Sequence, residues 1–409
     1  MWFRILILAL GTFAIGTDGF VIAGVLDDIA AQAGVEVSQA GQLITVFAWV
    51  LAVSSPVLAA ALGRFPRRGV LLWGLGIFTL GNLLIALSSD YEVLVAGRAV
   101  AAIGAAMFVP NAAVAATAVA PEEARGRALA VVGGGITVAT VFGSPLGTYL
   151  GSYTSYQGVF WMLTGVGVVA LIGVAVFLPT LPNPPATSLR TRLSVLKVRG
   201  VGGTLLTTLL AFLGGFTVYT YIKLLLEEIL EVDAGTLTLL LVVYGIGGAC
   251  GNFAAGWLVD KWGSTKTTVM CVLGFAVMLG ILPWTGTTVA GAAVTLLLFA
   301  GFAWMILLSQ QHRLIGLAPK APPLVISLNT SAQYIGIGAS GLVGGAVIDM
   351  GDVRNIGPTG AVLALVSLVV YLISVARSRA TETNQAASET AAPPAQRPAA
   401  QRPAAQHAD

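Results

Sequence analysis

Charged residues, histidine and cysteine are scarce in this chain of 409 residues. Asp, Glu, Lys and Arg make up 10% of it, whereas soluble proteins carry about 25%. Two histidines and two cysteines, Cys250 and Cys271, are too few for a His/Cys metal site. Both cysteines lie in apolar segments, which predicts small, membrane-buried residues that form no disulfide. The composition excludes a soluble domain and offers no catalytic constellation, so we expect neither an enzyme nor a bound metal or other cofactor.

Apolar residues are abundant, at 56% of the chain, and they gather in long runs. A helix needs around 20 such residues to cross about 30 Å of hydrocarbon. Twelve runs reach this length, which predicts an all-α polytopic membrane protein with twelve transmembrane helices: 4–26, 40–62, 69–88, 92–119, 127–151, 158–178, 203–224, 236–259, 267–284, 288–309, 323–348 and 357–376.

The connections between these runs carry opposite charges on the two sides of the membrane. Alternate connections hold most of the 21 Lys and Arg residues, with clusters at 64–68 and 190–199. The remaining connections hold one cation, Arg354, and collect acids such as Asp27, Asp90 and Glu227. Because cationic loops stay in the cytoplasm, we predict a multi-pass protein of the cell's inner (plasma) membrane, with both termini cytoplasmic.

The chain also divides into two similar halves. The pair Gly19-Phe20 in the first span recurs as Gly215-Phe216 in the seventh, and Gly147 has a counterpart in Gly345. A proline-rich, then cationic, connection separates six spans from six. We therefore predict an N-terminal six-helix half (1–178), a cytoplasmic linker (179–202), a C-terminal six-helix half (203–376) and a disordered Ala/Pro-rich cytoplasmic tail (377–409).

Two ionisable residues, Asp18 and Arg98, lie clearly within the predicted spans. Both fall in the half of the membrane nearer the acidic connections. A charge in hydrocarbon is costly unless it faces the bundle interior or a partner. Asp18 and Arg98 are therefore candidates for a proton-coupling pair, in which Asp18 carries the proton. The alternative is a structural ion pair that only holds two helices together.

Several motifs resemble those of the major facilitator superfamily, in its twelve-helix drug:proton antiporter branch. The stretch GWLVDKWGSTK at 256–266 resembles the superfamily's cytoplasmic-loop signature, and AALGRFPRR at 60–68 is a degraded copy of it. Gly97-Arg98 resembles the family's helix-four arginine motif, and GSPLG at 143–147 its helix-five antiporter motif. The stretches GTDGFV at 16–21 and NTSAQ at 329–333 are similar to bacterial chloramphenicol-, purine- and arabinose-efflux permeases.

This resemblance implies roles for residues that the motifs contain. It implies a cytoplasmic gate formed by Arg64, Asp260, Lys261 and Lys266, and a helix-packing motif formed by Gly143, Pro145 and Gly147. The subgroup usually has a glutamate directly before the phenylalanine of the first helix. This chain has Gly19 there, and its acid is Asp18, about 100° around the helix.

Aromatic and amide residues on several spans could line an amphipathic substrate pocket, because pockets for organic ligands are mostly apolar with a few polar groups. The candidates are Phe20, Phe47, Trp49, Phe216, Tyr219, Tyr244, Trp304, Asn329 and Gln333. Each could instead be an ordinary packing or lipid-facing residue. Lys223 and Glu227 lie at the end of a span, where a solvated or snorkelling side chain is expected.

The combined prediction is a secondary active exporter of small organic molecules, such as drugs or antibiotics, that works by proton antiport and alternating access. An exporter of purines, nucleosides or sugars is the alternative within the same fold. A non-transporting membrane sensor is a third hypothesis, which the short connections disfavour. The expected partners are a small-molecule substrate, protons and the lipid bilayer, with no nucleic acid, and the protein is expected to be a monomer.

Overall fold

The structure, a computed structural model, describes residues 1–181, 194–319 and 321–391. Part of the predicted linker (182–193), Lys320 and the end of the predicted tail (392–409) lie outside the described residues. Every regular element in the described ranges is a helix, as predicted from the apolar runs.

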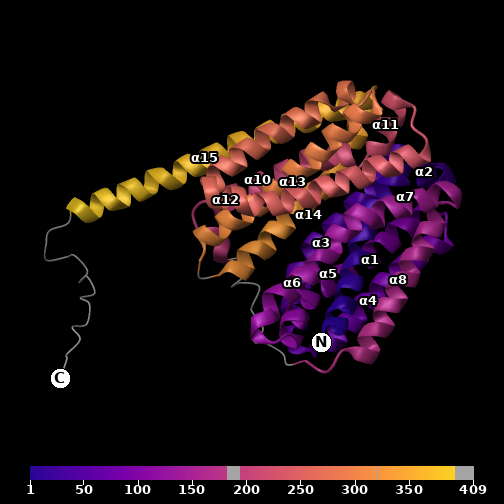
Figure 1. The fold of residues 1–409 in the computed structure, drawn as a ribbon, viewed down its shortest axis with the longest axis horizontal. Helices are drawn as coiled ribbons and strands as arrows, with labels where there is room; N and C mark the ends of the chain where they lie inside the picture. The colour runs from indigo at the N-terminus through magenta and orange to yellow at the C-terminus, as the bar shows by residue number, and fades with distance from the viewer. Residues whose placement is uncertain (182–193, 320, 392–409) are drawn as a thin grey trace.

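The helices form two bundles, which Figure 1 shows side by side. The first bundle contains α1 (Trp2–Val21), α2 (Leu26–Ala33), α3 (Val37–Ala61), α4 (Arg67–Leu87), α5 (Tyr91–Val119), α6 (Arg125–Val138), α7 (Ser144–Tyr153) and α8 (Tyr156–Phe177). The second contains α10 (Val201–Tyr219), α11 (Ile222–Leu230), α12 (Ala234–Thr285), α13 (Val289–Leu317), α14 (Pro322–Asp349) and α15 (Ile356–Ala391). Short turns link them: 3-10 turns at Ile22–Gly24, Leu62–Arg64, Glu122–Ala124, Val195–Lys197 and Val353–Asn355, and a π-helical turn at Ala139–Gly143.

Eleven of the described helices are long and apolar enough to cross a membrane. One of them, α12, has 52 residues and would extend roughly 78 Å, more than twice the hydrocarbon thickness. Its path breaks at Gly263, whose φ of 77° and ψ of 159° are not helical. With α12 counted as two spans, the described helices contain the twelve predicted spans.

Polar side chains mark where several of these helices begin. The Asp90 carboxylate accepts hydrogen bonds from the backbone N–H groups of Glu92, at 2.8 Å, and Val93, at 3.4 Å, at the start of α5. Asp233 caps α12 in the same way through the N–H of Thr236. Such caps satisfy N–H groups that have no partner inside the helix. They fix the helix starts next to short connections.

Two helices extend beyond their predicted ends. Helix α13 continues past 309 to Leu317, so Arg313 is inside a helix rather than in a connection. Helix α15 continues past 376 to Ala391, so residues 377–391 are helical where the sequence predicts a disordered tail. The reason is local: nine of these fifteen residues are Ala, Arg, Glu or Gln, which favour helix, and the first proline after them is Pro393.

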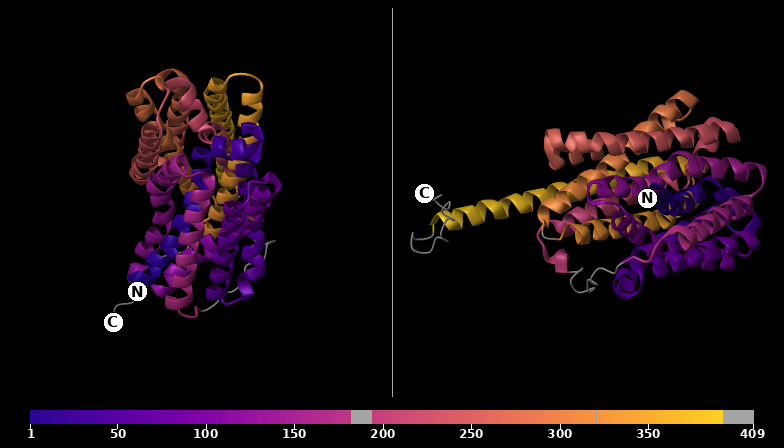
Figure 2. Two further views of the ribbon diagram at one scale, coloured as in Figure 1. Left: turned by 90° about the vertical axis from the view of Figure 1, so that its right-hand side faces the viewer. Right: turned by 60° about the horizontal axis from the view of Figure 1, so that its bottom comes forward.

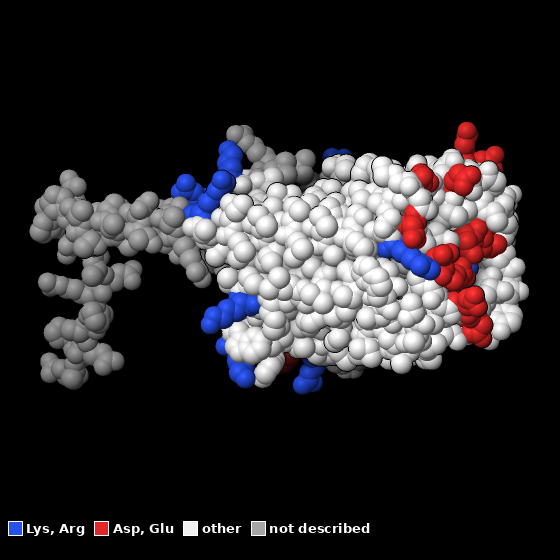
Figure 3. All heavy atoms as spheres, turned by 90° about the horizontal axis from the view of Figure 1, so that it is seen from above, with Lys and Arg blue, Asp and Glu red and all other residues white. Residues whose placement is uncertain are grey.

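Charge divides the molecule into an acidic end and a basic end (Figure 3). At the acidic end, the segments just before α3, α5 and α12 hold Asp27, Asp28, Asp90, Glu227 and Glu228. At the basic end, the turns at the starts of α4 and α6 and the break in α12 hold Arg64, Arg67, Arg68, Arg125, Arg127, Lys261 and Lys266. The rotated views of Figure 2 show the two bundles running between these ends. Both candidate sites lie between them.

Candidate functional site

Asp18 and Arg98 meet inside the first bundle. The Arg98 Nη1 atom donates to Asp18 Oδ1 at 2.8 Å, and the two side chains are 1% and 0% exposed, respectively. Asp18 comes from α1 and Arg98 from α5, so the pair joins two helices that are distant in the sequence. The sequence placed both charges in the same half of the membrane, and in the structure their side chains meet. Whether the pair carries protons is a separate question of function.

Helix α3 completes the surroundings of Arg98. The Arg98 Nε atom donates to the Leu43 carbonyl oxygen at 3.3 Å, and the guanidinium carbon lies 4.1 Å from the centre of the Phe47 ring. Arg98 thus contacts a carboxylate, a carbonyl and an aromatic face, which all suit a cation. Asp18 Oδ2 is buried and has no hydrogen-bond partner among the described residues. The ion pair therefore uses one carboxylate oxygen of the two.

The glycine–proline motif lets a second segment approach α1 closely. A side-chain carbon at Gly143 would overlap Thr17, and one at Gly147 would overlap Val21. Pro145 lies in the first turn of α7, directly after the π-helical turn Ala139–Gly143. A π-helical turn inside a helix is rare and often lies at a functional site. The motif thus lies at a helix contact one residue away from Asp18.

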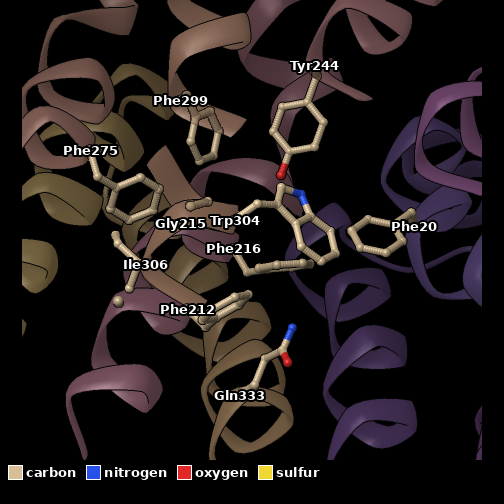
Figure 4. A pocket seen from close by; sticks show the side chains of 12 residues that line it. Phe20, Phe212, Gly215, Phe216, Tyr244, Phe275, Phe299, Trp304, Ile306 and Gln333 are labelled. Carbon is tan, nitrogen blue, oxygen red and sulfur yellow. The ribbon is translucent and has the colours of Figure 1, made fainter. Parts of the chain in front are cut away.

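A pocket lined by aromatic side chains lies where α1 meets the second bundle (Figure 4). Phe20 reaches it from α1, and the other lining residues belong to the second bundle: Ala211, Phe212, Gly215, Phe216, Tyr244, Phe275, Phe299, Ala303, Trp304, Ile306 and Gln333. Among the described residues, no charged side chain lines it. The cavity volume is about 20 Å³, which is room for about one water molecule. A larger ligand can enter only if the rings move apart.

The rings around this pocket contact one another across the two bundles. The Phe20 ring centre lies 5.9 Å from that of Phe216 and 5.7 Å from that of Tyr219. The Tyr219 ring centre lies 4.7 Å from that of Tyr244, and the Tyr244 ring centre lies 5.3 Å from that of Phe299. The Tyr219 hydroxyl also donates to the Phe20 carbonyl oxygen at 3.4 Å. These contacts close the pocket on the side of the first bundle.

Five of the nine predicted substrate residues line this pocket: Phe20, Phe216, Tyr244, Trp304 and Gln333. Tyr219 packs beside it. The other three lie outside it. Phe47 stacks on Arg98, and Trp49 donates from Nε1 to the Ile335 carbonyl at 3.2 Å, between the bundles. Asn329 is fully buried and accepts from Thr208 at 2.8 Å. The sequence places these residues on membrane-spanning helices but does not determine which helix face they occupy.

Sequence reasoning missed several residues around these sites. Phe212 is one helical turn from Phe216, so the spacing of four could have identified it. Phe275 and Phe299 have no comparable signal, since α12 and α13 are apolar on every side. Tyr334, next to Gln333 on α14, lies near Asp18 and packs against two hydrophobic clusters, one within the first bundle and one that spans both bundles.

The predicted gate residues lie at the basic end and face solvent. Asp260, Lys261, Lys266 and Arg64 are all exposed. The Lys261 ammonium lies 4.7 Å from the centre of the Trp257 ring. Gating by this cluster stays a prediction, because a gate of this kind is expected to form its ion pairs in one conformation of the transporter and not in another.

Two other cations form contacts that the sequence does not predict. The sequence predicts a solvated or snorkelling Lys223, and in the structure its Nζ atom lies 2.7 Å from both carboxylate oxygens of Asp27 in the first bundle. Arg313 was assigned to a connection, but it is buried against the Tyr371 ring and donates to Ser374 at 3.4 Å. Lys223 therefore links the bundles at the acidic end, and Arg313 is a second buried arginine.

Comparisons with known proteins agree with this architecture. The family model described as "Major Facilitator Superfamily" matches residues 8–318 and, in a second match, 204–405. "Uncharacterized MFS-type transporter YbcL" of Bacillus subtilis (strain 168) is 30% identical, with 93% of this chain and 99% of the relative covered. "Inner membrane transport protein YdhP" of Escherichia coli (strain K12) is also 30% identical, with 93% and 97% covered. The crystal structure of the human organic anion transporter MFSD10 (TETRAN) superposes with a TM-score of 0.64 at 16% identity, covering 90% of this chain and 99% of that one. At that identity the likeness concerns the fold alone.

Proposed function

The chain belongs to the major facilitator superfamily of transporters, and we propose that it is a proton-driven exporter of small organic molecules. The observation that carries this proposal is the fully buried Asp18–Arg98 pair next to an uncharged aromatic pocket. Asp18 and Phe20 are two residues apart on α1, so one helix contributes to both sites. A change in one site can therefore reach the other through α1.

The charge pair has the chemistry that proton coupling needs. Arg98 does not release its proton at accessible pH, so Asp18 is the member of the pair that can alternate between a charged and a neutral form. One of its oxygens is free of hydrogen-bond partners among the described residues. Each proton entering the cell supplies about 1.4 kcal/mol per pH unit and about 2.3 kcal/mol per 100 mV. This is enough to drive export of a small molecule.

The pocket indicates the class of substrate. Its wall is aromatic and aliphatic, and the polar groups at it are the Gln333 amide, the Tyr244 hydroxyl and the Trp304 indole N–H. Apolar walls with a few placed polar groups suit small, largely apolar organic molecules. The walls come from both bundles, so a rearrangement of the bundles would open and close the pocket.

Contacts between the bundles support alternating access. Near the acidic end, Lys223 forms an ion pair with Asp27. Helix α3 contacts α14 through the Thr45 hydroxyl, which donates to the Gly338 carbonyl at 2.6 Å. We assign the basic end to the cytoplasm, because cationic segments stay inside. The described conformation is then closed towards the outside. Transport requires the contacts at the acidic end to break.

The test separates coupling from transport. A pump-deficient bacterial host that expresses the chain is first screened for resistance or export with chloramphenicol, purine nucleosides and arabinose as probes. With the exported probe, Asp18→Asn protein in proteoliposomes should retain exchange and downhill movement but lose accumulation driven by a pH gradient.

The matched control is Asp260→Asn, which removes an exposed aspartate at the basic end. It should slow transport and leave proton-driven accumulation in place. If Asp18→Asn still accumulates the probe with an unchanged proton dependence, Asp18 is not the proton carrier. If chloramphenicol is not exported, whether or not a nucleoside or arabinose is, the assigned class of largely apolar substrates is wrong.

A further inference from the structure

Helix α3 supplies two of the three contacts that hold Arg98. The Leu43 carbonyl accepts from Arg98 Nε at 3.3 Å, and the Phe47 ring lies under the guanidinium at 4.1 Å. Leu43 and Phe47 are four residues apart, so they lie on one face of α3. Phe47 is itself buried, at 3% exposure. The position of the Arg98 charge therefore depends on the position of α3.

The opposite face of α3 contacts the other bundle. Thr45 and Trp49 are each two residues from the Arg98-facing positions, about 200° around the helix. The Thr45 hydroxyl donates to the Gly338 carbonyl at 2.6 Å, and Trp49 Nε1 donates to the Ile335 carbonyl at 3.2 Å. A side chain at Gly338 would overlap the Trp49 ring, so α3 and α14 approach closely here.

We propose that α3 transmits movement of the second bundle to Arg98, and that Phe47 is the positioning residue that keeps Arg98 on a single oxygen of Asp18. This inference rests on the proposed role of Asp18 as proton carrier. It adds that helix α3 makes the Asp18–Arg98 pair respond to the conformation of the transporter. Helix α3 packs along α5 in its own bundle and along α14 in the other. It cannot move relative to either helix without disturbing one of the two sets of contacts.

The physical consequence follows from the geometry of the guanidinium group. Arginine has five N–H donors in a planar fork and pairs most strongly with a carboxylate through two parallel hydrogen bonds. Leu43 and Phe47 hold Arg98 so that one atom, Nη1, reaches Asp18, and Oδ2 stays free to take a proton. When α3 withdraws, Arg98 is free to turn towards both oxygens, and the charged form of Asp18 becomes favoured. Movement of the bundles thereby controls proton binding and release.

The experiment measures protonation of Asp18 directly and needs no substrate. Infrared difference spectra of the full-length protein in lipid are recorded from about pH 4 to about pH 10. The carboxylic-acid C=O band of Asp18 is identified by its loss in Asp18→Asn. Phe47→Leu removes the ring and should move the midpoint of this band by about half to one pH unit towards acid.

Matched variants separate positioning from packing. Phe47→Tyr keeps the aromatic face and should restore the wild-type midpoint. Phe78→Leu removes a buried ring of the same core, on α4, and should leave the midpoint unchanged. Phe47→Met serves as a second ring-free variant if the leucine variant is not recovered. Trp49→Phe removes the hydrogen bond to Ile335 and should shift the midpoint in the same direction by less.

The outcomes distinguish the two proposals. If the Asp18 band titrates in the wild type and its midpoint is the same in Phe47→Leu or Phe47→Met, Phe47 does not position Arg98. If Phe78→Leu shifts the midpoint as much as Phe47→Leu, general loosening of the core explains the effect, and the inference fails. If Asp18 shows no titration over the whole pH range in the wild type, the proposed function itself fails.

Discussion

Each bundle buries an arginine over an aromatic ring, but the two arginines have different partners. Arg98 in the first bundle lies 4.1 Å from the Phe47 ring and pairs with Asp18 at 2.8 Å. Arg313 in the second lies 4.8 Å from the Tyr371 ring and contacts the Ser374 hydroxyl. In the described part of the chain, Arg313 forms no ion pair with a carboxylate.

Under the proposed function, this difference would assign different tasks to the two bundles. A guanidinium stays protonated, so a buried arginine with neutral partners is a fixed charge. A guanidinium paired with a carboxylate belongs to a site that can change its net charge, because the carboxylate can take a proton. We therefore associate proton coupling with the first bundle. The second bundle, which supplies most of the aromatic pocket, would bind the substrate.

The largest expected effect comes from removing each arginine charge. Arg98→Met leaves the Asp18 carboxylate buried without its partner, which costs about 3–5 kcal/mol. Arg313→Met strands no carboxylate among the described residues and should cost much less. Thermal unfolding of the purified proteins in detergent measures both. Equal losses of stability in Arg98→Met and Arg313→Met would contradict the inferred difference between the two arginines.

A double variant is the control for this experiment. Asp18→Asn combined with Arg98→Met removes both members of the pair, so no buried charge is left alone. It should recover most of the stability that Arg98→Met loses, since the two sites are coupled. Additive losses would mean that the pair contributes through packing rather than through charge.

An intermediate effect should separate the pocket from the pair. Trp304→Ala truncates a pocket wall of the second bundle and should raise the KM for the exported probe about 10- to 100-fold, as expected for the loss of a buried hydrophobic contact. Its pH dependence of transport should remain that of the wild type. Trp284→Ala, at a side chain that is 68% exposed, is the matched control. A changed pH dependence in Trp304→Ala would place the two functions in one site.

The smallest effect concerns a third cation, Lys223, which lies between Asp27 and Glu227 at the acidic end. Burial raises the pKa of the Glu227 carboxyl above its ordinary value of 4.5. The positive charge of Lys223 lowers this pKa, and the negative charge of Asp27 raises it further, so the net pKa shift is upward. The folded protein therefore holds this proton more tightly than the unfolded chain does, and stability falls as the pH rises through the raised value.

Glu227→Gln removes this titration. At neutral pH the variant should be slightly more stable than the wild type, by less than about 1 kcal/mol because the site is partly exposed. The gain should vanish once the pH falls below 4.5, where the carboxyl is protonated in both states. Unfolding midpoints measured across this pH range test the sign. A variant that is less stable than the wild type at neutral pH, by a difference that vanishes towards acid, would show that the favourable contact with Lys223 dominates.

The residues differ in how well the sequence predicts their roles. The membrane spans follow from the lengths of the apolar runs, and the meeting of Asp18 and Arg98 follows from the cost of an unpaired charge in hydrocarbon. Phe47 and Trp49 are two residues apart on one predicted helix, and the sequence assigned both to the pocket. In the structure one faces Arg98 and the other faces α14.

The sequence alone thus determined the helical class, the number of spans, the separation of charge between the two ends and the identity of the buried ion pair. These properties depend on how many apolar and charged residues the chain has and where they lie in the sequence. A charged residue that is misplaced in the hydrocarbon costs free energy. Only the tertiary structure decided which aromatic rings form the pocket, that α3 holds Arg98, and that Arg313 is buried. The reason is that helices that are apolar on all sides carry no amphipathic pattern to reveal their inward face. That face is chosen by the shapes of the neighbouring helices, which come from distant parts of the chain.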